Sequence, residues 1–257
     1  MACGNQNYFV GNGPVYLRRV GDNCGAPNEG WWSVGDANEL KISISQDFAD
    51  HYESLTGVRA RSARWLNQTA ADFTMSVQNF NATNLAALLQ GTASGAVVGG
   101  SIVDESNTNV YEGQVFFVAY PGISAVSIDE GITPLVLNTD YELVDGGRDG
   151  GIRIITGAPN ISGSGPLTLD VSYTHVGVSD VISALQTGVQ DYEIRFNGIN
   201  LNAPNTPVIV TMNRAQVNAA EELSLIGQDI TSLSFTGAVL PDSGAEFFTV
   251  TLSNTVA

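Results

Sequence analysis

The sequence predicts a mainly β protein, an antiparallel β-sandwich with one short α-helix beside it and one long hairpin loop. Apolar and polar residues alternate over several short segments, which is typical of strands that bury one face. Glycine is abundant, with 28 residues in a chain of 257, and Ser, Thr and Asn are frequent between the segments, as in β proteins with many turns. This length can bury one large β domain or two small ones, and we expect a single domain over residues 1–257.

Two segments in the first third of the chain predict a pair of half-buried strands. In residues 38–45, Leu40, Ile42 and Ile44 alternate with polar residues. Residues 72–78 repeat the same pattern with three further apolar side chains. A period of two residues places these apolar side chains on one face, which we expect to lie on the core.

The residues between these two strands, 46–71, show no apolar alternation. Tight hairpins close with two to five residues, and a much longer connection is usually functional or disordered. We therefore expect a long polar loop over 46–71. A third of the arginines of the chain lie within six consecutive positions of this loop. They are Arg59, Arg61 and Arg64.

A short helix is expected over residues 84–90. Asn81 or Thr83 can cap its N-terminus, leucines at helical spacing form one apolar stripe, and Gly91 can end it. Residues 179–186 can form a short helix or a strand, and the spacing of their apolar residues favours the helix. Residues 121–178 are expected to form a β-rich elaboration of the domain. The other predicted strands are 14–20, 109–120, 123–128, 134–144, 152–155, 167–173, 192–198, 207–213, 232–237 and 247–252.

The net charge of the chain is strongly negative. Twenty-six acidic residues against ten basic ones give −16. This balance argues against nucleic-acid binding, which depends on Lys and Arg at the phosphates. It suits a surface that DNA passes without adhering, although acidity can also serve solubility alone. The sequence has no apolar run of membrane-spanning length and no signal-peptide pattern at its N-terminus, so no membrane partner is expected.

Nothing in the sequence predicts an enzyme, a cofactor or a metal site. The two cysteines, Cys3 and Cys24, are expected to be free thiols in a reducing cytoplasm, and with two histidines they do not form a zinc-ligand pattern. His51 lies near Asp50 and Glu53, but no nucleophile motif accompanies it.

The order strand, long loop, strand, helix resembles the tail tube (major tail) proteins of long-tailed bacteriophages, with the non-contractile type expected. A second matching stretch lies near the C-terminus, and the two together cover roughly half of the chain. The segments that carry the resemblance are 40–45, 53–57, 71–80, 84–91, 192–198, 207–213, 220–227, 232–237 and 247–252.

The resemblance implies a barrel-like tail tube fold and a structural role in the virion. Subunits would form rings, hexameric in the family, that stack into a tube assembled in the host cytoplasm and later conduct the genome DNA. The implied partners are other copies of the chain, a tape-measure protein, a tail terminator and distal tail proteins. The alternatives are another self-assembling phage β protein, such as a decoration or baseplate-proximal tail protein, and a carbohydrate-binding adhesin.

Two sets of site residues follow from this interpretation. By resemblance, the long loop would reach the next ring, its arginines would meet carboxylates there, and a tryptophan would anchor the contact. The ring-stacking residues are Asp50, Glu53, Arg59, Arg61, Arg64 and Trp65. The polar alternates of the two strands would line the lumen as a face nearly free of bases. These residues are Lys41, Ser43, Asp72, Thr74, Ser76, Ser232 and Ser234.

Overall fold

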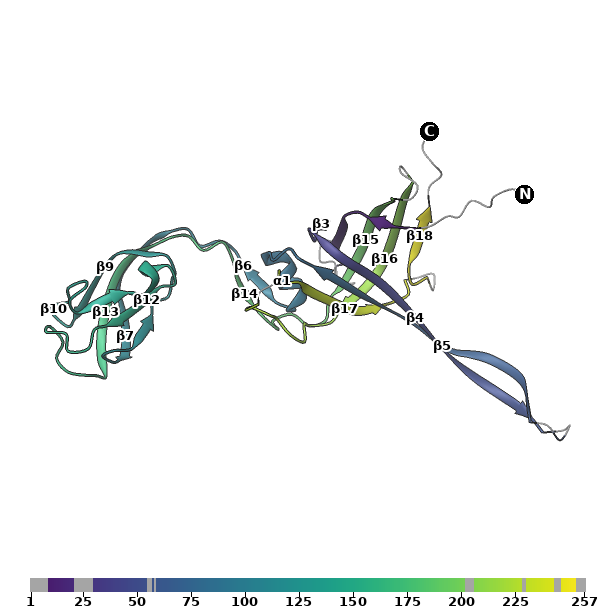
Figure 1. Ribbon diagram of the computed structural model, residues 1–257, viewed down its shortest axis with the longest axis horizontal. Helices are drawn as coiled ribbons and strands as arrows, with labels where there is room; N and C mark the ends of the chain where they lie inside the picture. Colours follow the sequence, from purple (N-terminus) through teal and green to yellow (C-terminus); the bar gives the residue numbers. More distant parts are fainter. Residues whose placement is uncertain are drawn as a thin grey trace. The chain divides into compact units, whose positions relative to one another are not determined.

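The structure is a computed structural model that describes residues 9–20, 30–54, 57, 59–201, 206–227, 230–242 and 246–252. Within these residues the protein is mainly β, its strand ladders are antiparallel, and it has one short α-helix, which confirms the predicted fold class. The chain divides into two compact units (Figure 1). Unit 1 comprises residues 1–93 and 182–257, and unit 2 comprises residues 94–181. Cys3 and Cys24 lie outside the described residues.

Unit 1 is built on one nine-stranded sheet in the order β3-β2-β15-β16-β17-β5-β4, with β1 paired to β15 and β18 paired to β16. The strands predicted near both ends of the chain therefore meet in one sheet. Their bounds are β1 (Gly11–Asn12), β2 (Val15–Arg19), β3 (Trp32–Ser33), β4 (Ala37–Glu53), β5 (Ala60–Val77), β15 (Asp191–Asn200), β16 (Pro207–Val217), β17 (Leu233–Val239) and β18 (Thr249–Leu252).

The core of unit 1 lies on one face of this sheet. Phe73, Met75 and Phe235 are fully buried at its centre. The alternation predicted for residues 72–78 is confirmed, because Ala71, Phe73, Met75 and Val77 are buried while Asp72 is exposed. Ile44 was expected to join this core. It lies on the core side of β4, but it is 60% exposed because the packed core ends at the neighbouring rung, Ile42.

Helix α1 (Ala82–Leu88) covers part of the same core. Asn81 is its N-cap, and its side chain accepts a hydrogen bond from the backbone N of Asn84 at 2.8 Å. The helix therefore begins earlier than the predicted 84–90 and ends at Leu88. The left-handed residue that follows is Gln90, with φ +46°, instead of Gly91.

Strands β4 and β5 continue well past the core, which corrects the predicted loop. They remain paired out to Glu53 and Ala60, so most of residues 46–71 is a two-stranded ribbon (Figure 1). Both faces of this ribbon are largely exposed. The apolar alternation that reveals a strand arises from burial of one face, and here neither face is buried.

Unit 2 is a β-sandwich of a four-stranded and a three-stranded sheet, in the orders β10-β9-β13-β7 and β11-β12-β8. Both sheets contribute to one separate core, with Tyr141, Ile152, Leu169 and Tyr173 at its centre. The bounds are β7 (Gly100–Val110), β8 (Val115–Phe117), β9 (Ile123–Glu130), β10 (Thr133–Pro134), β11 (Tyr141–Leu143), η1 (Val144–Gly147), β12 (Gly151–Ile154) and β13 (Leu167–His175).

The two cores change the predicted organisation of the chain. The sequence predicted one domain with an elaboration over 121–178, but residues 94–181 form a unit of their own because β7 and β8 pair within it. The predicted strand 109–120 is split between β7 and β8, and 134–144 is split between β10 and β11. The predicted helix over 179–186 is wrong. Val181–Ser183 forms strand β14, which pairs with β6 (Thr92–Ser94).

Candidate functional site

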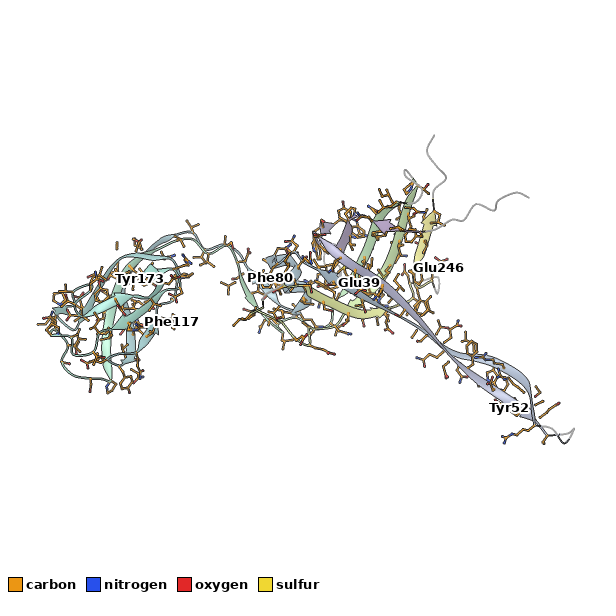
Figure 2. All side chains as sticks on the ribbon, in the orientation of Figure 1. Glu39, Tyr52, Phe80, Phe117, Tyr173 and Glu246 are labelled. Atoms are coloured by element: carbon orange, nitrogen blue, oxygen red, sulfur yellow. The ribbon has the colours of Figure 1, made fainter. Side chains whose placement is uncertain are left out.

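The outer part of the β4–β5 ribbon, residues 46–53 and 60–69, is called the β-arm here. Eight residues of β4 at ~3.3 Å each extend about 25 Å. The register is continuous from Gln46 opposite Thr69 to Glu53 opposite Ala60, apart from two irregularities. Figure 2 shows Tyr52 far out along the arm. An isolated two-stranded hairpin is at best marginally stable in water, so the arm has little stability of its own.

Three of the predicted ring-stacking residues meet on one face of the arm. Asp50 lies between two guanidinium groups, with Arg64 Nε 3.5 Å from Oδ1 and Arg61 Nε 3.6 Å from Oδ2. The Arg64 guanidinium also lies 3.8 Å from the centre of the Phe48 ring. These two arginines, which were expected to meet carboxylates of another ring, thus have a carboxylate within their own chain.

Arg59 is placed differently, near the tip of the arm. Its guanidinium lies 5.6 Å from the centre of the Tyr52 ring, and of the residues described, no carboxylate lies within ion-pair distance of it. Glu53, the remaining acid of the predicted set, stands opposite Ala60 in the ladder.

Trp65 stands apart from the arginine cluster. Its cross-strand partner is Ala49, whereas Arg64 pairs with Asp50 at the adjacent rung, so Trp65 and Arg64 point to opposite faces. The Trp65 side chain is 53% exposed. Phe48 and Tyr52, whose rings each lie under an arginine, were not predicted as site residues. The sequence could have indicated them, because two residues four positions apart lie on the same face of a strand.

The predicted lumen-facing residues largely come together on the outer face of the sheet, opposite the core. In the register of β17, β5 and β4, Ser234 lies beside Ser76, and Thr74 lies beside Lys41. Asp72 lies beside Ser43 in the next row. Ser232 precedes β17 and is exposed. The sequence analysis missed Glu39, which is opposite Ser76 and forms an ion pair with Lys41.

The outer face also carries arginines, which corrects the expectation of a face nearly free of bases. Arg18 on β2 forms an ion pair with Glu193 on β15 at 2.5 Å. Arg195 on β15 stands opposite Tyr16, and its Nε donates to Asn197 Oδ1 at 2.8 Å. These strands were predicted separately, and alternation alone could not show that they share a sheet with β4 and β5.

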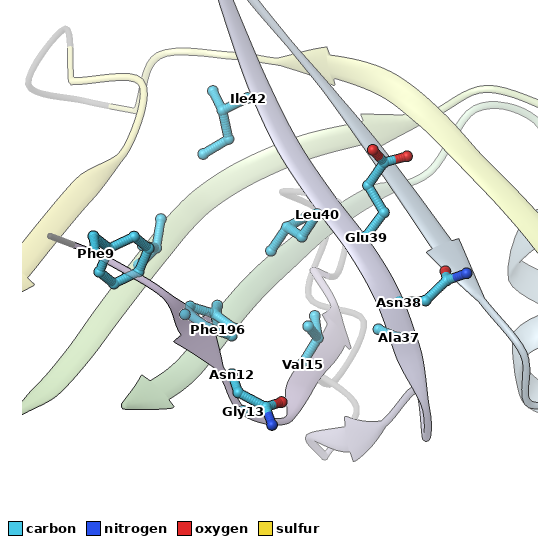
Figure 3. A pocket seen from close by; sticks show the side chains of 12 residues that line it. Phe9, Asn12, Gly13, Val15, Ala37, Asn38, Glu39, Leu40, Ile42 and Phe196 are labelled. Carbon is cyan, nitrogen blue, oxygen red and sulfur yellow. The ribbon is translucent and has the colours of Figure 1, made fainter. Parts of the chain in front are cut away.

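A pocket of about 310 Å³ opens on the core side of unit 1. Figure 3 shows Phe9, Val15, Leu40 and Phe196 directed toward a common space, with Ile42 farther along β4. The lining residues come from β1, β2, β4, β15 and β16. Strands from opposite ends of the sheet order thus meet around the pocket, so the sheet curls upon itself.

Two ionisable groups with displaced pKa values lie in unit 2. Burial alone would raise the pKa of Asp140, but hydrogen bonds from the Asn160 side chain and from the backbone N of Val136 and Asn160 outweigh it, so its pKa lies below the usual value. Burial, together with the hydrogen bond to Glu105, raises the pKa of the Tyr173 hydroxyl. Both groups lie within the sandwich core, where their hydrogen bonds connect neighbouring segments.

In the described part of the chain, no three or more side chains of His, Cys, Asp and Glu gather as a metal ion would require. No helix among these residues combines the length and the apolarity needed to cross a bilayer. His51 lies on the exposed arm opposite Ala63.

A family model described as "Protein of unknown function UCP028589" matches residues 8–247, which cover all of unit 2 and most of unit 1. No curated protein matches the chain.

Proposed function

The chain belongs to the family UCP028589, and from this premise we propose that it is a structural subunit that assembles with copies of itself into stacked rings. The tube so formed would be the tail tube of a long-tailed bacteriophage, assembled in the host cytoplasm and present in the virion. Hexameric rings, a tape-measure protein inside the tube, and a tail terminator and distal tail proteins at its ends follow from the sequence resemblance. The proposal requires no catalysis and no cofactor.

The observation that carries the proposal is the β-arm. It extends about 25 Å beyond the packed core, and it exposes Phe48, Tyr52, Trp65 and Leu66. Aromatic residues and arginine are enriched at protein interfaces, and contiguous exposed apolar surface on a soluble protein usually marks an interaction site. The arm is thus suited to hold a neighbouring copy.

The outer face of the sheet supports the second part of the proposal, a conduit for DNA. Its rows of Ser and Thr hydroxyls with Asp72 and Glu39 offer few groups that would hold a phosphate. Of the bases described on this face, Lys41 and Arg18 form ion pairs with carboxylates, and Arg195 donates to Asn197. Together with the net charge of −16, such a face would repel duplex DNA within a Debye length of about 8 Å.

The decisive experiment compares the protein with a variant that lacks the arm. Residues 47–68 are replaced by Asn-Gly, which connects the paired residues Gln46 and Thr69 through a two-residue turn. Negative-stain electron microscopy over a concentration series should show tubes or stacked rings for the full chain. The variant should remain folded by circular dichroism and should form at most single rings.

The matched control deletes nothing from the arm but changes an exposed apolar residue of unit 2, Phe117→Ala. Its assembly should equal that of the unchanged chain. Tubes formed by the arm-less variant would overturn the role given to the arm. A full chain that stays monomeric even with an initiating tail complex would overturn the tube and favour the decoration or adhesin alternatives.

A further inference from the structure

We propose that Trp65 of one copy docks into the pocket of unit 1 of a second copy, the pocket whose apolar side chains include Phe9, Leu40 and Phe196. This inference deepens the proposed function, on which it rests, by naming both sides of the contact between copies. The occupant of the pocket is thus a second copy of this chain.

Trp65 is the exposed aromatic side chain of the arm that is best placed for insertion. On the same face, Ala49 is its cross-strand partner and Ala63 lies two residues along the strand, with His51 opposite Ala63. In the described part of the chain, no ring or guanidinium stacks on the Trp65 ring, whereas Phe48 and Tyr52 each have an arginine over the ring. The indole is flanked by two alanines, and 53% of the side chain is exposed.

The pocket has the size and the chemistry to receive this side chain. Its volume is about 310 Å³. Apolar side chains, among them Leu40, Phe196 and Val210, line it together with the polar residues Asn12, Asn38 and Glu39. Asn12 lies at the pocket edge (Figure 3), where its carboxamide oxygen can accept the indole N–H. A buried tryptophan generally needs one such partner, and tryptophan in a desolvated pocket is a frequent hot spot.

Charge favours the arm as the segment that approaches another copy. Residues 46–71 contain three acids and three arginines, so their net charge is zero and the whole net charge of −16 falls on the rest of the chain. Two copies repel one another through most of their surfaces. A neutral arm can reach the neighbour without that repulsion, and the three arginines of the arm are attracted to the neighbour's acidic surface.

The two surfaces also determine the kind of assembly. Trp65 and the pocket are different patches of unit 1. Where two copies do not exchange arms about a two-fold axis, the contact is heterologous, and after one pairing one copy keeps a free pocket and the other a free Trp65. A heterologous contact produces a closed ring or an open filament. Docking of Trp65 would therefore propagate from copy to copy, as a stacked tube requires.

The test uses disulfide trapping between two variants of the full chain. Both carry Cys3→Ser and Cys24→Ser, one carries Trp65→Cys, and the other carries Asn12→Cys at the exposed edge of the pocket. After mixing with oxidised glutathione, we expect a cross-linked heterodimer on a non-reducing gel. Leu66→Cys, at the adjacent position on the other face of the arm, is the matched control and should give no such band.

A second measurement follows self-association by sedimentation. Trp65→Ala should weaken it about 30-fold, the loss expected of a hot-spot residue, and Trp65→Phe should retain part of it. Val210→Phe, which fills the pocket, should weaken it equally. If that variant misfolds, Phe9→Ala removes an exposed wall of the pocket instead.

The outcomes separate this inference from the proposed function. Tubes that form while the Trp65→Cys and Asn12→Cys variants give no cross-link, and that tolerate Trp65→Ala, would overturn the docking contact and leave the tube standing. Cross-linked oligomers that never become rings or tubes would support the docking contact and overturn the tube.

Discussion

Asn84 shows how a single buried amide holds helix α1 to the sheet of unit 1. Its side-chain nitrogen donates to the carbonyls of Val34 (2.9 Å) and Asn79 (3.0 Å), and its oxygen accepts from Trp32 Nε1 at 3.3 Å. The residue is fully buried. One side chain on helix α1 thus connects the segment before β4, which contains Trp32 and Val34, with Asn79 after β5.

We predict that Asn84→Ala lowers the free energy of unfolding of unit 1 by about 2–4 kcal/mol, because buried polar partners lose their hydrogen bonds. Urea unfolding followed by circular dichroism measures the change. Thr83→Ala, one residue away and exposed, is the matched control and should stay within ~0.5 kcal/mol. Equal stability of the Asn84 variant would contradict the role assigned to this side chain.

Asp140 plays a comparable role in unit 2, with a dependence on pH. Its carboxylate accepts hydrogen bonds from Val136 N at 2.7 Å and from the Asn160 side chain at 2.8 Å. Because the pKa of Asp140 is lower in the folded state, its stabilisation is present above the unfolded pKa of about 4 and is lost as the pH falls further.

Asp140→Asn should therefore destabilise unit 2 at pH 7 and reduce the loss of stability below about pH 4. Thermal unfolding between pH 3 and 7 measures both effects. The exposed Asp180→Asn should retain the pH dependence of the unchanged protein. A parallel pH profile for the Asp140 variant would show that other carboxylates dominate acid unfolding.

At the scale of elements, burial decides what could be predicted from sequence. Strand β5 was predicted where Phe73 and Met75 are buried, and helix α1 where Asn81 caps it. The β-arm was predicted as a loop, because strands exposed on both faces have no alternation. Strand β14 was predicted as a helix, because its apolar residues happen to have helical spacing and pairing with β6 decides its conformation.

For the candidate site, the sequence identified the arginines and Trp65 but not their arrangement. Asp50 meets Arg61 and Arg64 only because irregularities at Asp47/Phe48 and His51/Tyr52 adjust the register. The pocket was not predicted at all, since its walls come from strands distant in sequence. Local patterns do not contain such information.

The position of the arm outside the core leads to a prediction about amide hydrogen exchange. In dispersed protein, amides of residues 46–53 should exchange at least tenfold faster than those of residues 71–77, because local opening of the arm exposes no core. Assembly should slow the exchange of the arm selectively. Mass spectrometry of proteolytic fragments resolves the two segments. Equal protection of both before assembly would show that the arm is stable by itself.

At the scale of the whole molecule, each unit has a core of its own, and the two chain segments that join them are neighbours. Strands β6 and β14 pair with one another, and Ser94 Oγ donates to the carbonyl of Val181 at 3.2 Å. The two points at which the chain leaves and re-enters unit 1 therefore lie side by side.

We predict that a chain in which residues 95–180 are replaced by Asn-Gly folds cooperatively and retains assembly. A turn of this kind suits the antiparallel pair, and the core of unit 1 contains no residue of unit 2. By calorimetry, the full chain should show two unfolding transitions, and the shortened chain should show one. Aggregation of the shortened chain, alongside a folded full chain, would mean that unit 1 depends on unit 2.

The β6–β14 pair has one more consequence. A chain that leaves and re-enters a fold through two adjacent hydrogen-bonded strands provides an insertion site. A domain whose N- and C-termini lie close together can be inserted there. Replacing unit 2 by a fluorescent, enzymatic or antigenic module would place one copy of that module on every subunit. The surface density of such cargo would then be set by the repeat of the assembly, with no chemical coupling step.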